Sequence, residues 1–202
     1  FTIWPDAPWT LDVLSRLLDH CLLHKAESPD GLPRFRVYES IREYAAQQMN
    51  RVGAIQRPDS ATSLTGPDQA QELCLRHARH FSELGTVDNL QSLEIRGGQE
   101  RRQALAAELE NLRAAFDFAS ESEHSNIAAL CALAMACHYL SYGISPGLAL
   151  LCRAVDLPNL DKPILGELHL WLGKLSSFTS DNNETHRHLL TAMAIARQEG
   201  NL

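Results

Sequence analysis

The stretch from Arg34 to Met49, Arg-Phe-Arg-Val-Tyr-Glu-Ser-Ile-Arg-Glu-Tyr-Ala-Ala-Gln-Gln-Met, changes its hydrophobic period in the middle. Its first part alternates, with Phe35 and Val37 on one side of an extended chain, which predicts a half-buried strand. Its second part has apolar residues at steps of three and four, which predicts an amphipathic helix. Ser40 and Glu43 have the spacing of a capping box at the joint. The repeating positions of the helix are Ile41, Tyr44, Ala45, Met49 and Val52.

The residues before this stretch predict a helix, a strand and a turn. A stripe of leucines begins at Leu11, with Thr10 as its N-cap, and reaches Cys21. A short strand is predicted at 22–25, and Pro29-Asp30-Gly31 has the composition of a tight turn. The second strand then spans 35–38. Because helix, strand, turn and strand is the order that ends a winged helix, residues 1–56 are predicted to be the C-terminal part of such a domain.

The residues after this stretch predict a linker and then helices. Pro, Ser, Thr and Gly crowd together between Gly53 and Pro67, which favours a flexible linker at 57–66. A helix is expected from Pro67 to Gly85, because proline suits a first helical position and glycine an end. After Gly97-Gly98 a long helix is expected, and its stripe runs without interruption through Leu105, Leu109, Leu112, Phe116 and Ala119.

The last part of the chain predicts two helix pairs. The segment Ile127–Leu140 is almost entirely apolar or small, which is typical of a helix packed between neighbours. Further helices are expected from Ser145 to Val155, from Asp161 to Leu175 and from Asn183 to Glu199. The pairs align at an offset of 37 residues, close to the tetratricopeptide period. The aligned positions are Leu133 with Leu170, Gly143 with Ser180 and Cys152 with Leu189.

These patterns together predict a mainly α fold. A partial winged helix with a small β-hairpin is followed by a tetratricopeptide-like helical repeat domain over 67–202, incomplete at its C-terminus. Since the chain opens abruptly at Phe1, we expect a fragment of a longer protein.

Composition limits the possible partners. The 202 residues carry a formal net charge of -7, so a general nucleic-acid-binding surface is not expected. No apolar run has the length of a membrane span, so no membrane association is expected. The cysteines are odd in number, lack any Cys-x-x-Cys spacing and sit mostly among apolar residues. Buried free thiols of a cytoplasmic protein are expected, in preference to disulfides or zinc ligands. They are Cys21, Cys74, Cys131, Cys137 and Cys152.

Three ordered stretches resemble the bacterial STAND-type signalling ATPases, the large regulators of the SARP and LuxR kind. The triplet Val37-Tyr38-Glu39 with the helix Ile41-Arg42-Glu43-Tyr44-Ala45 resembles the end of their winged helix. Arg76-His77-Ala78-Arg79-His80-Phe81 is similar to their Arg-His-Ala-x-x-Phe run. Glu110-Asn111-Leu112-Arg113-Ala114-Ala115 resembles their Asp-Asn-Leu-Arg-Ala-Ala helix.

The resemblance implies regulatory work beside a nucleotide-binding domain. In these ATPases a His at the middle of the triplet senses the nucleotide phosphate, and this chain has Tyr38 there. A tyrosine hydroxyl can donate to phosphate and an arginine can pair with it, so Tyr38 and Arg36 are candidates for sensing a nucleotide held by an adjoining domain. The chain has no P-loop, so no cofactor is expected in this fragment, while ATP or ADP belongs to the full-length protein.

No catalytic residue and no metal ligand are assigned. No nucleophile elbow is present, although a triad of distant residues, as in a helical hydrolase, stays an alternative. His77 and His80 lie one helical turn apart, but the flanking Arg76 and Arg79 would repel a cation.

The sequence is compatible with two binding functions. The first is a sensor that binds a protein partner or a small effector through its repeats and relays this through the winged helix. Its groove residues are predicted on the first helix of each pair, at His138, Tyr139, His169 and Lys174. The alternative is a helical-repeat adaptor whose winged helix binds DNA directly. Direct DNA binding is disfavoured, because the helix over 11–20 pairs Arg16 and His20 with two aspartates that repel phosphates.

Overall fold

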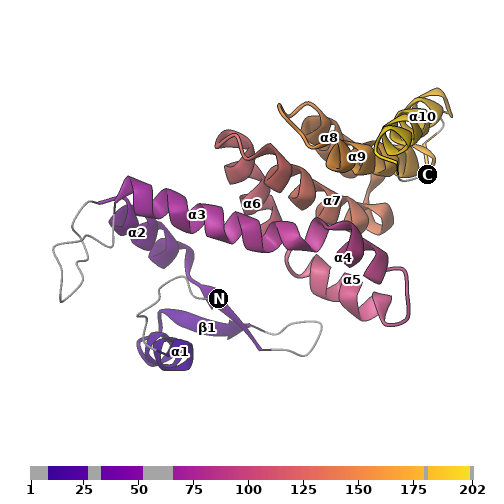
Figure 1. The fold of residues 1–202 in the computed structure, drawn as a ribbon. Helices are drawn as coiled ribbons and strands as arrows, with labels where there is room; N and C mark the ends of the chain where they lie inside the picture. The colour runs from indigo at the N-terminus through magenta and orange to yellow at the C-terminus, as the bar shows by residue number, and fades with distance from the viewer. Residues whose placement is uncertain (1–8, 27–32, 52–65, 180–181, 201–202) are drawn as a thin grey trace. The chain divides into compact units, whose positions relative to one another are not determined.

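The computed structural model describes residues 9–26, 33–51, 66–179 and 182–200, and it confirms a mainly α fold with a small β-hairpin (Figure 1). Within these residues it has ten α-helices, one 3-10 helix and one two-stranded sheet. The chain divides into two compact units, Phe1–Arg76 and His77–Leu202. Except for Gly66, the predicted linker at 57–66 lies outside the described residues, so the predicted domain limits stay a prediction.

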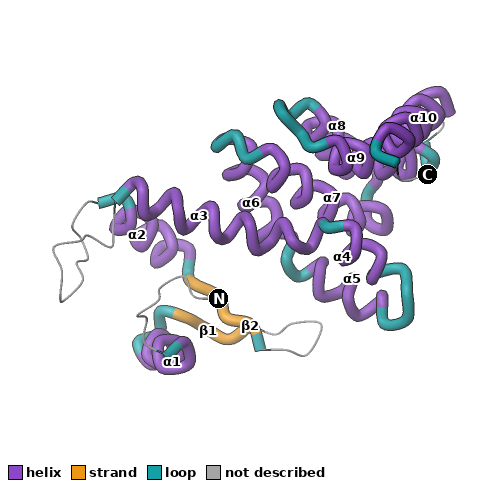
Figure 2. The backbone as a smooth tube through the Cα atoms, viewed as in Figure 1, coloured by secondary structure: helices purple, strands orange, loops and turns teal. Residues whose placement is uncertain are grey.

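The first unit contains the predicted helix, hairpin and helix. Its two strands form an antiparallel hairpin (Figure 2). Leu23 lies opposite Val37, and His24 lies opposite Arg36. The predicted turn between them lies outside the described residues. The elements are α1 Thr10–Asp19, β1 Leu23–Ala26, β2 Arg34–Val37, α2 Glu39–Met49 and the first part of α3 Pro67–Ser82.

The predicted half-burial of the second strand is wrong. Phe35 is 38% exposed and Val37 is 43% exposed. Helix α1 packs against β1, whose residues are mostly half-buried, whereas Phe35 and Val37 of β2 stay exposed. No residue of α1, β1, β2 or α2 is buried, and Leu14, Leu17 and Leu18 of the leucine stripe in α1 are only half-buried.

The predicted capping boundaries are also displaced. Helix α2 begins at Glu39, and Tyr38 is its N-cap with φ -62° and ψ 142°. Ser40 therefore lies inside the first turn and cannot cap the helix, so the predicted capping box is wrong. Thr10 is the first residue of α1, and Trp9 takes the N-cap position. The period of a pattern locates a helix, but it does not fix the turn at which the backbone leaves the extended conformation.

The second unit is helical throughout its described residues. It begins with the end of α3, and Pro67 is the first residue of that helix, as predicted. The later elements are η1 Glu83–Gly85, α4 Val87–Ser92, α5 Gly98–Ala106, α6 Leu109–Glu121, α7 Ser125–Tyr142, α8 Ile144–Val155, α9 Lys162–Ser176 and α10 Asn182–Gln198.

Helix α7 is the centre of the core. Every residue from Cys131 to Cys137 is buried, and α7 packs against α6, α8, α9 and η1. This confirms the prediction that the alanine-rich segment is packed between neighbours. Helix α9 packs against α8 and α10, so α7–α8 and α9–α10 are consecutive helix pairs at the predicted positions. The tetratricopeptide-like character of these pairs stays a prediction.

The predicted long helix after Gly97-Gly98 is broken. Helix α5 ends at Ala106 and α6 begins at Leu109, although the apolar stripe continues across the break. Helix α5 is fixed to the end of α4, because Arg101 and Arg102 donate hydrogen bonds to carbonyl oxygens of residues 92–96. After the turn at 107–108, α6 packs against α7. The stripe carries no signal for these polar contacts, and the short helix α4 was likewise not predicted.

The cysteines are free but not uniformly buried. Cys131 and Cys137 are buried in α7, as predicted. Cys21, Cys74 and Cys152 are exposed, so the expectation of burial is wrong for them. Cys74 of α3 and Cys152 of α8 lie on helix surfaces that turn toward solvent, and Cys21 lies in the turn after α1 with a φ of 54°.

Candidate functional site

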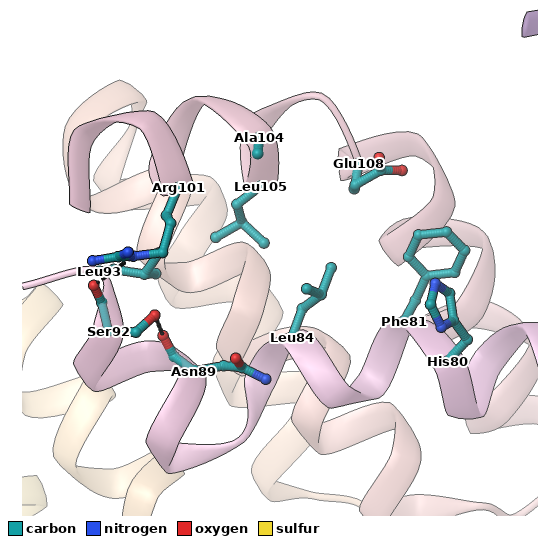
Figure 3. Close-up of a pocket in the computed structure, with 10 residues that line it drawn as sticks. All are labelled: His80, Phe81, Leu84, Asn89, Ser92, Leu93, Arg101, Ala104, Leu105 and Glu108. Atoms are coloured by element: carbon teal, nitrogen blue, oxygen red, sulfur yellow. Dashed lines mark hydrogen bonds between the residues drawn. The ribbon is translucent and has the colours of Figure 1, made fainter. Parts of the chain in front are cut away.

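A cleft of about 350 Å³ lies in the second unit between the end of α3, α4 and α5 (Figure 3). Its size is within the range of small-ligand sites in proteins. The residues that line it are His80, Phe81, Leu84, Asn89, Ser92, Leu93, Arg101, Ala104, Leu105 and Glu108.

The floor of the cleft is apolar. Leu84 of η1 and Leu105 of α5 point toward each other across it, and Phe81 closes one end (Figure 3). Leu93 and Leu105 are 6% and 5% exposed and belong to the core. Phe81 and Leu84 are three positions apart in consecutive helical turns, so their side chains lie on the same face and both line the floor. An apolar group entering here would leave water and contact a rigid surface.

The polar rim is held by hydrogen bonds to the backbone. Arg101 donates from Nε to the carbonyl oxygen of Ser92 at 2.8 Å and from Nη2 to that of Arg96 at 2.6 Å. The Ser92 hydroxyl donates to the Asn89 carbonyl oxygen at 2.6 Å, and Asn89 Nδ2 donates to the Glu83 carbonyl oxygen at 2.6 Å. These contacts fix the rim before any ligand arrives, which lowers the entropic cost of binding.

One end of the cleft is acidic. Glu108 accepts a hydrogen bond from Asn111 Nδ2 at 2.7 Å. Burial lowers the pKa of nearby His77, and His80 lowers it further, while Asn111 and Glu108 oppose the change. Burial therefore favours the neutral form of His77, and Glu108 places a carboxyl group at this end of the cleft.

His138 and Tyr139, predicted as groove residues, lie together near the end of α7. Their rings meet edge to face with centroids 5.7 Å apart, and His138 stacks on Tyr142 at 4.6 Å. The Tyr139 hydroxyl accepts a hydrogen bond from Arg113 Nη2 at 3.0 Å. His138 also lines a hollow of about 150 Å³ with Arg102 of α5.

Lys174 and His169, the other two predicted groove residues, have different neighbours on α9. Lys174 Nζ lies 4.6 Å from the centroid of the Trp171 ring and 3.7 Å from Glu94 Oε1. It lines a hollow of about 170 Å³ with Glu167, whose pKa is raised by burial. His169 contacts His188 of α10. A shared partner groove for the four residues stays a prediction.

Tyr38 and Arg36, the nucleotide-sensing candidates, lie beside His24 in the first unit. Tyr38 is 50% exposed, and its ring centroid is 4.6 Å from that of His24. Arg36 is exposed and directly opposite His24 in the sheet. His24 Nδ1 is buried and has no hydrogen-bond partner among the described residues. Sequence reasoning missed His24, because its neighbours come from the other strand of the hairpin.

The described residues hold no group of three or more His, Cys, Asp or Glu side chains arranged to bind a metal ion. In the same ranges of the chain, no helix is long and apolar enough to cross a membrane. Comparisons with protein-family models, with curated proteins and with solved structures found no match.

Sequence reasoning did not find the cleft. Two features of the sequence pointed to parts of the cleft. His80 and Phe81 end the Arg-His-Ala run, and Gly97-Gly98 mark the turn that precedes α5. The missing signal was α4, a six-residue helix too short for a periodic pattern.

Proposed function

We propose that this chain is a non-catalytic regulatory part of a multidomain cytoplasmic signalling ATPase or transcriptional regulator. In this proposal the second unit binds a protein partner or a small effector, and the hairpin unit relays binding to an adjoining nucleotide-binding domain. The observation that carries the proposal is the cleft between α3, α4 and α5, which combines an apolar floor with a rim held in place by Arg101, Ser92 and Asn89. Such a site suits an apolar side chain or ring whose polar edge reaches the rim.

The first unit supports the relay. It displays large apolar side chains and has no buried residue in its four complete elements, so it offers a surface for another domain. Tyr38, Arg36 and His24 lie on this unit and would meet a phosphate at that boundary. The exposed large apolar side chains among its described residues are Trp9, Leu11, Val13, Leu22, Phe35, Val37, Tyr38 and Tyr44.

The experiment compares two alanine-to-leucine variants of the full chain. Ala104→Leu puts three more carbon atoms into the cleft, whereas Ala114→Leu adds the same atoms at an exposed position of α6. The probe is 8-anilinonaphthalene-1-sulfonate, an apolar dye with one anionic group, followed by fluorescence. We expect Ala104→Leu to weaken dye binding at least tenfold and Ala114→Leu to leave it unchanged.

The biological partner is then tested with the same pair. Proteins retained from an extract of the source cells are identified, purified and titrated against each variant by calorimetry. A partner that binds the wild type and Ala114→Leu equally and loses affinity for Ala104→Leu supports the proposal. Equal affinity for both variants contradicts it, and salt-dependent binding of duplex DNA by the purified chain would favour the adaptor alternative.

A further inference from the structure

Two histidines join the last two helices. His169 Nδ1 of α9 lies 2.9 Å from His188 Nδ1 of α10, and the ring centroids are 5.2 Å apart. Only 6% of His188 is exposed. A hydrogen bond between two imidazole nitrogens needs one N–H and one lone pair. The contact therefore exists only while one of the two Nδ1 atoms is unprotonated.

Arg187 determines which nitrogen carries the proton. Its Nη2 lies 3.1 Å from His188 Nε2. A guanidinium can only donate, so His188 Nε2 accepts and the proton of His188 is on Nδ1. His188 then donates to His169 Nδ1, and His169 keeps its proton on Nε2. The result is a chain of donors from Arg187 through His188 to His169, with both rings neutral.

Burial and Arg187 favour neutral rings, whereas Glu184 favours the charged form of His188. On α10, Glu184 Oε2 lies 3.4 Å from His188 Nε2 and also accepts from Arg187 Nε at 3.2 Å. From α8, Cys152 interacts electrostatically with Glu184 and Arg187. Burial lowers the pKa of both histidines most, and Arg187 lowers both further, while Glu184 opposes the change at His188. The proximity of His188 also lowers the pKa of His169.

A proton taken up by either ring breaks a hydrogen bond. At His188 Nε2 the new N–H opposes the N–H of Arg187. At His169 Nδ1 it opposes the N–H of His188. Either proton also adds a positive charge close to Arg187, and His188 itself is buried.

We propose that the His169–His188 pair is a proton-sensitive latch, which holds α10 against α9 at neutral pH and loosens it as the pH falls below about 6.5. The neighbouring contact between α9 and α10 is apolar and close. A Cβ built at Gly173 of α9 would lie 2.6 Å from Leu189 Cδ2 of α10. The proposal goes beyond partner binding, because neither histidine lines the cleft between α3, α4 and α5.

The direction of the pH effect follows from the protonation equilibria. The folded-state pKa values of His169 and His188 lie below the value of 6.5 for an unperturbed histidine. As the pH falls, the unfolded or detached helix therefore binds protons first. The stability that the pair contributes is complete above pH 6.5 and is lost as the pH falls below it toward the lower folded-state values.

The first test reads the protons directly on the wild-type chain. Long-range ¹H–¹⁵N correlation spectra at pH 7.5 distinguish imidazoles protonated on Nδ1 from those protonated on Nε2. We expect the Nδ1–H form for His188 and the Nε2–H form for His169. The reverse assignment, or two charged rings at this pH, would overturn the proposal without depending on any variant.

The second test measures hydrogen exchange of α10 in the full chain at pH 7.5 and 5.5, corrected for the intrinsic pH dependence. We expect the protection factors of Asn182–Gln198 to fall about tenfold in the wild type between these two pH values. The double variant His169→Gln/His188→Gln has amides that can bond to each other and do not titrate, so its protection should change less than about twofold.

The control is His186→Gln, an exposed histidine of the same helix, which should keep the loss seen in the wild type. A loss of protection in the double variant as large as that in the wild type would refute the latch, as would a wild type whose α10 is equally protected at both pH values. Far-UV circular dichroism establishes that the compared chains are folded.

Discussion

Gly85 lies against the backbone of α7. A Cβ built at this position would be 1.8 Å from the carbonyl oxygen of Leu130. Gly85→Ala therefore forces η1 and α7 apart, and we expect it to lower the free energy of unfolding by about 3 kcal/mol, at the upper end of overpacking costs. Urea denaturation of the full chain measures the change.

Gly200→Ala is the control for this substitution. Gly200 has a φ of +73° but no atom within 4 Å of its missing Cβ. Alanine there meets only the conformational penalty of about 1 kcal/mol. If Gly85→Ala cost no more than Gly200→Ala, the close approach of η1 and α7 would be disproved.

The five cysteines should differ in reactivity. Burial raises the pKa of Cys131 to about 12, and it also raises the pKa of Cys137 and of Cys152, although only Cys152 of these three is exposed to the reagent. At pH 8 only about one Cys131 thiol in ten thousand is a thiolate, which is the reactive form. We expect Ellman's reagent to modify the exposed thiols rapidly in the native chain and the two in α7 only after unfolding.

Two variants identify which thiols react rapidly with the reagent. Cys152→Ser removes one exposed thiol and should lower the rapid count from three to two, whereas Cys131→Ala should leave it at three. Rapid modification of all five thiols in native buffer would show that α7 is not buried.

At the scale of elements, Arg101 holds α5 on the end of α4. Its two hydrogen bonds reach the carbonyl oxygens of Ser92 and Arg96. Arg101→Ala removes the donor of both hydrogen bonds. A partly exposed hydrogen bond from a charged group contributes at most about 2 kcal/mol to stability. We expect a loss of about 2 kcal/mol and faster hydrogen exchange in Val87–Ser92.

The matched change is Arg96→Ala, which removes an exposed side chain but keeps the carbonyl group that accepts from Arg101. It should alter stability by less than about 0.5 kcal/mol. Exchange in α4 that is equally fast in both variants would mean that the side chain of Arg101 does not fix the rim.

The sequence predicts elements that bury a full face and misses those fixed by polar contacts. Helix α7 was predictable, because Ala128 to Ala136 leave no polar face for solvent. The turn at 107–108 was not, since Arg101 and Arg102 find their acceptors in another element. The cleft depends on that turn and on α4, so sequence reasoning placed the candidate residues on α7 and α9 instead.

At the scale of the whole chain, hydrophobic burial is distributed unevenly. All buried hydrophobic side chains of the described residues lie between Ala78 and Leu175. The first unit has a helix with a strong leucine stripe, a hairpin and a second helix, but none of them buries a side chain. Since burial of apolar surface is the main favourable term in folding, the two units must differ in their capacity to fold alone.

This difference can be tested by cutting the chain before Pro67, which keeps α3 whole. The fragment 67–202 contains the entire core, so we expect one cooperative urea transition with a midpoint close to that of the full chain. The fragment 1–66 should show no cooperative transition, because none of its described apolar side chains is buried. A sigmoidal transition for 1–66, or a collapse of 67–202 to a non-cooperative state, would contradict this view, and the first outcome would also remove the support that the exposed surface gives to a relay.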